Sequence, residues 1–170
     1  MNVLRAQSGR RFLRLVAAAL MAAAFQTGAF AQTPLITAAE SGDIAALESA
    51  LQNGAAVDER DARKRTALMA AVQANQGEAA RLLIEAGADV NAKDGIEDSP
   101  YLLAGARGYQ DIRRLTLDNG ADLESTNRFG GTALIPAADR GHVETVRTLI
   151  EAGVDLDHVN KLGWTALLEA

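Results

Sequence analysis

Two histidines are the only imidazole groups of the sequence, and neither has the spacing that catalysis or metal binding requires. His142 and Glu144 are two residues apart, so on a helix they point in different directions. His158 falls in a turn and has no partner of ligand type at a fixed spacing. The five serines form no Ser–His–Asp pattern, and neither a phosphate-binding glycine loop nor an H-E-x-x-H zinc motif occurs. We therefore expect no enzymatic activity, no catalytic residue, no metal ligand and no cofactor.

The composition is that of an ordinary folded protein, with 48% hydrophobic and 23% charged residues. Aromatic residues make up only 4%, which favours helices packed through small side chains. The sequence has no cysteine, which excludes disulfides, thiol catalysis and zinc–thiolate sites. Beyond residue 31 there are 13 basic and 22 acidic residues, a formal charge of −9. Because nucleic-acid affinity comes largely from lysine and arginine, this balance argues against a nucleic-acid partner.

The first 31 residues have the three-part pattern of a secretory signal peptide. Four arginines and no acid occupy residues 1–14, residues 15–25 form an apolar run, and Ala29 and Ala31 supply small residues for cleavage. A membrane span needs about 20 apolar residues, so this run of 11 is short for an anchor. We expect cleavage after Ala31, a periplasmic or secreted protein, and no stable membrane insertion after signal removal. The alternative is an uncleaved N-terminal anchor.

Residues 32–170 carry one pattern at a constant interval of 33. A hydroxyl residue opens each unit and is followed by proline or alanine, then by leucine or tyrosine. The hydroxyl residues are Thr33, Thr66, Ser99, Thr132 and Thr165. Nine and 21 residues later stand glycines, with Asn75 as the one exception. We predict units starting at 33, 66, 99 and 132, and a partial unit at 165.

Each recurring residue has a physical role in a pair of helices. Threonine or serine is a good N-cap, and proline suits the first turn, where its missing N–H has no partner. Pro136, in the fourth position of its helix, is expected to cost little for the same reason. Glycine or asparagine ends a helix in the left-handed conformation. In the second helices, six residues at helical spacing are predicted to face the core: Leu82, Leu83, Ile84, Val146, Leu149 and Ile150.

The 33-residue period with its T-P-L or T-A-L opening resembles ankyrin repeats, and specifically the exported bacterial ankyrin-repeat proteins. The resemblance implies an all-α solenoid of helix-turn-helix units with projecting β-turn or hairpin tips. By analogy it also implies protein binding without catalysis. Arg113 and Thr116 replace the apolar residues that the next unit has at matching positions, so the third unit should be the weakest. The last unit stops within a helix, and we expect a truncated chain.

The concave side of such a stack is formed by the tips and the exposed side of each first helix. Asp61, Asp94, Asn127 and Asn160 recur 33 apart as turn formers. The first tip is basic and the second acidic, whereas the third and fourth carry large apolar residues. Tryptophan, tyrosine and arginine dominate binding hot spots. The predicted protein-binding residues are Ile96, Arg107, Phe129, Arg140, Leu162 and Trp164. Alternatively, the aromatic residues pack on the adjacent turn.

These features predict a monomeric, exported protein–protein interaction module with no chemistry of its own. A second hypothesis keeps the fold but makes the protein an inhibitor or chaperone-like stabiliser of an exported enzyme. A third makes it the non-catalytic part of a longer enzyme. No residue pattern separates the first two hypotheses, because they differ only in what binding does to the partner.

Overall fold

The computed structural model describes residues 33–170, and the predicted signal peptide, residues 1–31, lies outside them. Nine helices and no strand occur in this range. The helices are α2 (Pro34–Ser41), α3 (Ile44–Gln52), α4 (Ala67–Gln73), α5 (Gly77–Glu85), α6 (Pro100–Arg107), α7 (Gln110–Asp118), α8 (Leu134–Asp139), α9 (Val143–Glu151) and α10 (Ala166–Glu169).

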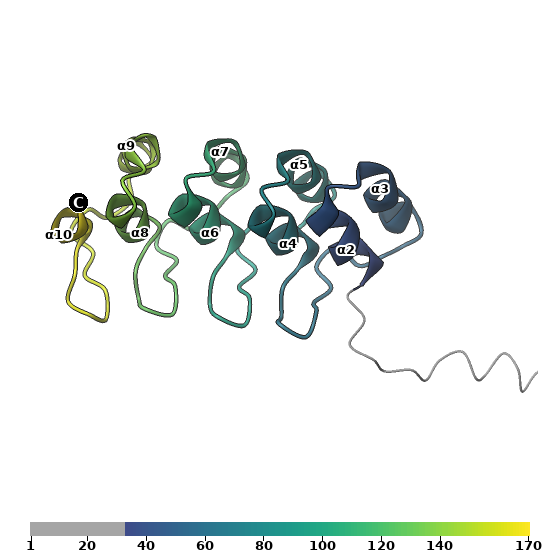
Figure 1. Cartoon of the computed structure of the whole chain (residues 1–170), viewed down its shortest axis with the longest axis horizontal. Helices are drawn as coiled ribbons and strands as arrows, with labels where there is room; N and C mark the ends of the chain where they lie inside the picture. The colour runs from purple at the N-terminus through teal and green to yellow at the C-terminus, as the bar shows by residue number, and fades with distance from the viewer. Residues whose placement is uncertain (1–32) are drawn as a thin grey trace, which may run out of the picture. The chain divides into compact units, whose positions relative to one another are not determined.

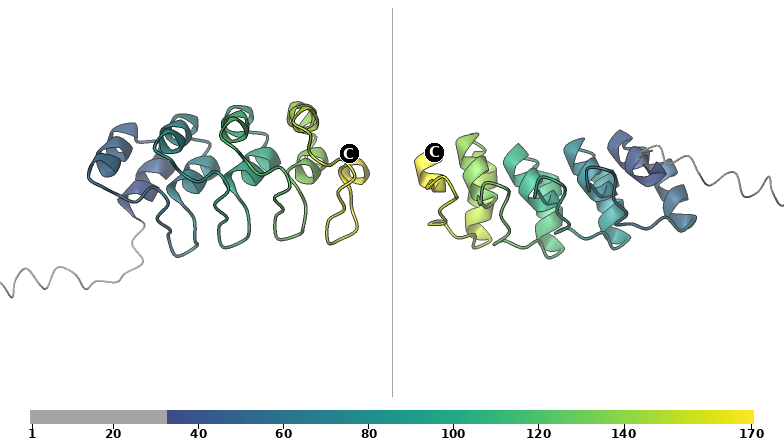
Figure 2. Two further views of the ribbon diagram at one scale, coloured as in Figure 1. Left: turned by 180° about the vertical axis from the view of Figure 1, so that it is seen from behind. Right: turned by 90° about the horizontal axis from the view of Figure 1, so that it is seen from below.

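The helices of residues 33–170 form two parallel rows (Figure 1). The first helices α2, α4, α6, α8 and α10 make one row, and the second helices α3, α5, α7 and α9 make the other. Long loops project from the first row on the side away from the second, as the two further views in Figure 2 also show. The predicted all-α stack of helix-turn-helix units is confirmed.

The hydroxyl residues that open the units cap their helices, as predicted, in four of five cases. Thr33, Thr66, Ser99 and Thr165 each accept a hydrogen bond from the backbone N–H three residues later, at 3.2–3.4 Å. The left-handed helix ends are confirmed as well, with φ values of 72° at Gly42, 57° at Asn75, 71° at Gly108 and 67° at Gly141.

The fourth unit departs from this pattern: the prediction of a cap at Thr132 is wrong, and so is the reason for which Pro136 was expected to cost little, namely that the N–H at its position has no partner. Helix α8 begins at Leu134, and the Thr132 hydroxyl is buried without a hydrogen-bond partner. At the position of Pro136, the first three units have an N–H that donates to the carbonyl of the capping residue, as Leu103 does to Ser99 at 3.0 Å. Proline has no N–H to give, so the first bond of the helix is lost and the helix starts later.

The predicted core positions of the second helices are confirmed except for one. Leu83 and Leu149 are fully buried and Ile84 is buried, while Leu82 and Val146 are half-buried. Ile150 is 46% exposed, so its assignment to the core is wrong. The matching Ile84 on α5 is covered because the next second helix, α7, packs beside α5. No second helix follows α9 within the described residues.

The third unit buries a charged group. Arg113 is fully buried and donates one hydrogen bond to the Gln110 side chain, while its Nε and second guanidinium nitrogen have no partner. Gln110 in turn donates to Thr145 of the next unit at 2.9 Å. The Tyr101 hydroxyl is also buried and unpaired. Burial lowers the pKa of Arg113 and raises the pKa of Tyr101 to about 12, because removal from water disfavours the charged form of each group.

Candidate functional site: the concave groove of the tips

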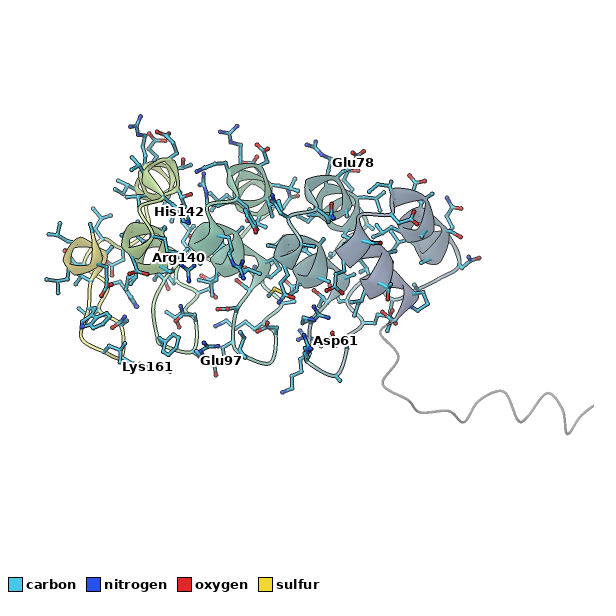
Figure 3. All side chains as sticks on the ribbon, in the orientation of Figure 1. Asp61, Glu78, Glu97, Arg140, His142 and Lys161 are labelled. Carbon is cyan, nitrogen blue, oxygen red and sulfur yellow. The ribbon has the colours of Figure 1, made fainter. Side chains whose placement is uncertain are left out.

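Four projecting tips, residues 61–65, 94–98, 127–131 and 160–164, share one construction. The carboxylate or amide oxygen of the first residue accepts backbone N–H bonds from the residues two and four places later, at 2.8–3.1 Å. The same residue exchanges backbone hydrogen bonds across the tip. These first residues are Asp61, Asp94, Asn127 and Asn160, and their predicted role as turn formers is confirmed. Figure 3 labels Asp61, Glu97 and Lys161 on three of the tips.

Neighbouring tips are also tied to each other. The Gly95 N–H donates to the Arg63 carbonyl, and the Lys161 N–H donates to the Phe129 carbonyl, both at 2.9 Å. These bonds hold the backbone of adjacent tips side by side.

Neighbouring tips are also linked by side-chain hydrogen bonds between residues 33 apart. These bonds and the backbone bonds between tips are here named the lateral ties. The Arg60 guanidinium donates to the Lys93 carbonyl at 2.6 Å, and Lys93 Nζ donates to the Thr126 carbonyl at 2.8 Å. Lys161 Nζ donates to the Arg128 carbonyl at 3.0 Å. Each acceptor is a backbone carbonyl, so the contact does not depend on which side chain the neighbouring unit carries.

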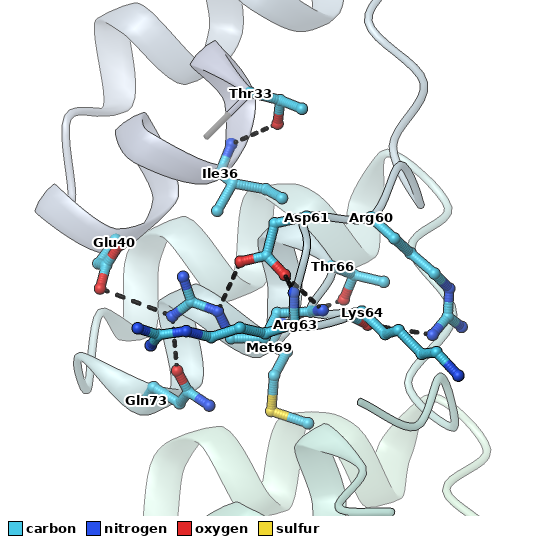
Figure 4. Close-up of polar contacts among 11 residues, drawn as sticks. Thr33, Ile36, Glu40, Arg60, Asp61, Arg63, Lys64, Thr66, Met69 and Gln73 are labelled. Atoms are coloured by element: carbon cyan, nitrogen blue, oxygen red, sulfur yellow. Dashed lines mark hydrogen bonds and ion pairs between the residues drawn. The ribbon is translucent and has the colours of Figure 1, made fainter. Parts of the chain in front are cut away.

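The first tip contains an internal ion-pair network (Figure 4). Arg65 is buried, lies 2.8 Å from the Asp61 carboxylate and 3.6 Å from Glu40, and donates to Gln73 at 2.8 Å. Burial raises the pKa of Asp61, but hydrogen bonds from Arg65 and Arg63 outweigh it, and the net shift is downward. Arg65 therefore supports the tip from inside. Arg65 does not contribute to the basic surface predicted for this tip, which is formed by the other cations of the tip.

Five of the six predicted binding residues line a single groove of about 370 Å³, here named the aromatic groove. These residues are Arg107, Phe129, Arg140, Leu162 and Trp164. Phe129 and Trp164 are each 47% exposed and Leu162 is 58% exposed. The sixth residue, Ile96, is not in this groove. It lies with Arg63, Lys64 and Gln73 in a separate hollow of about 530 Å³, here named the basic hollow.

Two of the groove residues are held by contacts to their neighbours. The Arg140 guanidinium donates to the Ala106 carbonyl of the preceding first helix. The Arg128 guanidinium lies 4.6 Å from the centre of the Phe129 ring, a cation–π contact. This contact lies within the tip of Phe129 and is not the packing on the adjacent turn that the alternative interpretation predicted, and about half of the Phe129 surface stays exposed.

Asp98 and Arg128 line the aromatic groove and were not among the predicted residues. The Asp98 side chain is half-buried. Burial and then the nearby Asp94 raise the pKa of Asp98, while Arg128, Arg140 and Lys93 oppose the shift. The available signal was the position itself, which is occupied by Arg65, Asp98, Gly131 and Trp164 in successive tips. Because the residue at this position differs in every unit, the position has no role in the fold that all units share.

Both histidines contact the preceding unit of the stack. A Cβ atom added at Gly108 would lie 2.8 Å from the His142 ring, so His142 packs against the end of helix α6. His158 Nε2 lies 2.6 Å from the Gly130 carbonyl of the preceding tip. Residues 33–170 contain no group of three or more histidines or carboxylates that could hold a metal ion.

The comparisons with known proteins decide the family. Residues 6–94 and 102–170 match the family described as "Ankyrin repeats (3 copies)". The crystal structure of an ankyrin repeat domain from Acinetobacter baumannii AYE is 65% identical in sequence. It superimposes with a TM-score of 0.79 over 81% of this chain and 70% of that chain. The chain belongs to the ankyrin-repeat family. No curated protein matches it significantly.

Ankyrin repeats form protein–protein interaction modules, and domains of this family are generally non-catalytic. The two hollows therefore lie on the surface of a binding module. Within residues 33–170 of this ankyrin-repeat protein, no helix has the length and apolar character needed to cross a membrane.

Proposed function

We propose that this ankyrin-repeat protein is exported and binds a protein partner through the aromatic groove. The observation that carries the proposal is the convergence of Phe129, Leu162 and Trp164 from two tips in one groove. All three are about half exposed or more, although none of their side chains is needed to form the turns, which are built by Asn127 and Asn160. Exposed apolar clusters of this kind typically mark interaction sites.

Binding is expected to depend on the two aromatic residues. Trp164→Ala and Phe129→Ala should each weaken the complex by about 2 kcal/mol or more, roughly 30-fold in Kd, because truncating a central aromatic anchor removes most of its contact. The melting temperature should change little, since both side chains are half exposed. The measurement is isothermal titration calorimetry with the partner captured from the periplasm of the exporting cell.

The matched control is Val143→Ala, which truncates an apolar side chain that is 65% exposed on α9, outside the groove. It should leave affinity unchanged. A large loss of stability in Trp164→Ala, with full affinity in the surviving folded fraction, would show that the aromatic residues serve the stack instead. Adding the purified domain to the partner then distinguishes a neutral binder from an inhibitor or stabiliser, by loss of the partner's activity or by a rise in its melting temperature.

Export is tested at the N-terminus. The basic segment, the 11-residue apolar run and Ala29-Phe30-Ala31 support cleavage after Ala31. Edman sequencing of the protein recovered from the periplasm or medium should therefore start at Gln32. Replacing Ala29 and Ala31 with arginine should block processing and leave the precursor in the membrane fraction. A mature protein that retains residues 15–25 would refute the export proposal in this form.

A further inference from the structure

We propose that the partner presents an extended segment with two distinct elements, a cluster of carboxylates and a large apolar side chain. The carboxylates bind Arg63 and Lys64 on the first tip, and the apolar side chain enters the aromatic groove. This inference rests on the proposed function, to which it adds the chemistry and the spacing of the bound segment.

The first argument is the charge of the basic hollow. Arg63 and Lys64 line it, are exposed, and form no ion pair, in a body whose formal charge is −9. One carboxylate, Asp94, also lines the hollow, and it accepts the backbone N–H groups of Ile96 and Asp98. In the first tip, Asp61 binds Arg65 and backbone N–H groups. Two uncompensated cations side by side therefore favour an acidic ligand.

The second argument is the different chemistry of the aromatic groove. Three arginines line it, but three carboxylates line it as well, so its formal charge is balanced. The arginines are Arg107, Arg128 and Arg140, and the carboxylates are Asp98, Asp139 and Glu169. What distinguishes the groove is the exposed surface of Phe129, Leu162 and Trp164. Its volume of about 370 Å³ suits one or two large apolar side chains.

The third argument is that the second tip lies between the two sites and carries an exposed apolar residue beside the cations of the basic hollow. Ile96 is 48% exposed on the second tip and lines the basic hollow. Asp98, at the end of the same tip, lines the aromatic groove. The second tip thus borders both hollows, and a segment that crosses it contacts both.

The distance between the two sites sets the length of the segment. The apolar side chains of the aromatic groove come from the third and fourth tips, so they lie on average about two and a half units from the first tip. Packed helices lie about 8–10 Å apart, so the separation is roughly 20–25 Å. An extended chain advances about 3.3 Å per residue, so about six to eight residues separate the carboxylates from the apolar side chain.

The experiment uses fluorescein-labelled synthetic peptides with four glutamates, a glycine–serine spacer of seven residues and a Leu-Phe pair. Binding is measured by fluorescence anisotropy and by the emission of Trp164, the one tryptophan of the sequence. The seven-residue peptide should bind at least ten times more tightly than a peptide with a two-residue spacer. Replacing its glutamates with glutamine, or its Leu-Phe pair with alanines, should also weaken binding at least tenfold.

The double variant Arg63→Glu/Lys64→Glu should lose at least tenfold in affinity for the acidic peptide and regain it for a peptide with four lysines. Arg81→Glu/Arg114→Glu, which makes the same charge change at exposed positions on α5 and α7, should bind like the wild type. The inference would be overturned if both double variants lost affinity equally, or if the peptides with the two spacer lengths bound equally well. It would also be overturned if no peptide bound. If Trp164→Ala weakens capture of the natural partner but Arg63→Glu/Lys64→Glu does not, the proposed function stands and this inference fails.

Discussion

Leu83→Ala is expected to lower the free energy of unfolding by about 2–5 kcal/mol. Leu83 is fully buried in the cluster that joins the first three units, with Leu47 and Leu68 in the same cluster. Removing its side chain there leaves a cavity that close-packed helices cannot fill without moving. Urea denaturation followed by circular dichroism measures the change.

Leu167→Ala provides the control, because the same truncation is made at a side chain that is 85% exposed on α10. It should change the unfolding free energy by no more than about 0.5 kcal/mol. Leu149→Ala should behave like Leu83→Ala, since Leu149 is also fully buried on its second helix. Equal effects at Leu83 and Leu167 would mean that burial in this stack does not control stability.

Arg113→Val is expected to stabilise the protein by about 1–4 kcal/mol, the range seen when buried charges are replaced by apolar residues. The guanidinium is fully buried, has no carboxylate partner and leaves two nitrogens without hydrogen bonds. Valine is the residue that the next unit has at the matching position, Val146. Both the removal of the charge and the apolar contact therefore favour the folded state.

Hydrogen exchange locates the effect. In the wild type, residues 99–120 should exchange faster than residues 66–87, because repeat arrays depend on nearest-neighbour interfaces. Arg113→Val should reduce this difference, whereas Arg114→Val, at the exposed neighbouring position, should leave it in place. Uniform protection of both segments in the wild type, or a less stable Arg113→Val protein, would refute the weak-unit interpretation.

Most of the fold follows from short-range rules, which explains why the sequence predicted it. A helix cap at Ser99 needs only the N–H three residues later, and a left-handed end at Gly108 needs only the absence of a Cβ atom. The turns built by Asp94 and Asn127 are equally local. Repetition at a constant interval then places each local structure beside its copy.

The errors arose where the neighbouring unit or the local bonding differs from the repeat pattern. Pro136 removes a backbone donor at a position where the first three units use one, so the pattern around Thr132 was misleading. Ile150 has the helical spacing of a core residue but lacks the neighbouring second helix that covers Ile84. Spacing within a helix identifies a face and does not show what packs against it.

The candidate site was partly predictable for the same reason. Phe129 and Leu162 occupy matching places in successive tips, so the stack was expected to bring them to one side, and both line the groove. The variable position of Asp98 marked it as free of a repeat role, but its inclusion in this groove depends on how the second tip packs beside the third unit. The separation of Ile96 into the basic hollow likewise depends on how the first two tips pack.

The lateral ties of the tips affect whether whole repeat units can be lost from the gene or duplicated in it. The contacts of Arg60, Lys93 and Lys161 all end on a backbone carbonyl 33 residues away, so any unit supplies the same acceptor. Loss of residues 66–98 by recombination would place the Thr126 carbonyl where Arg60 now meets the Lys93 carbonyl, and duplication of that stretch would extend the series. For these contacts between tips, the coding sequence can thus be lengthened or shortened by whole units, and the recognition surface resized, without a new acceptor having to evolve.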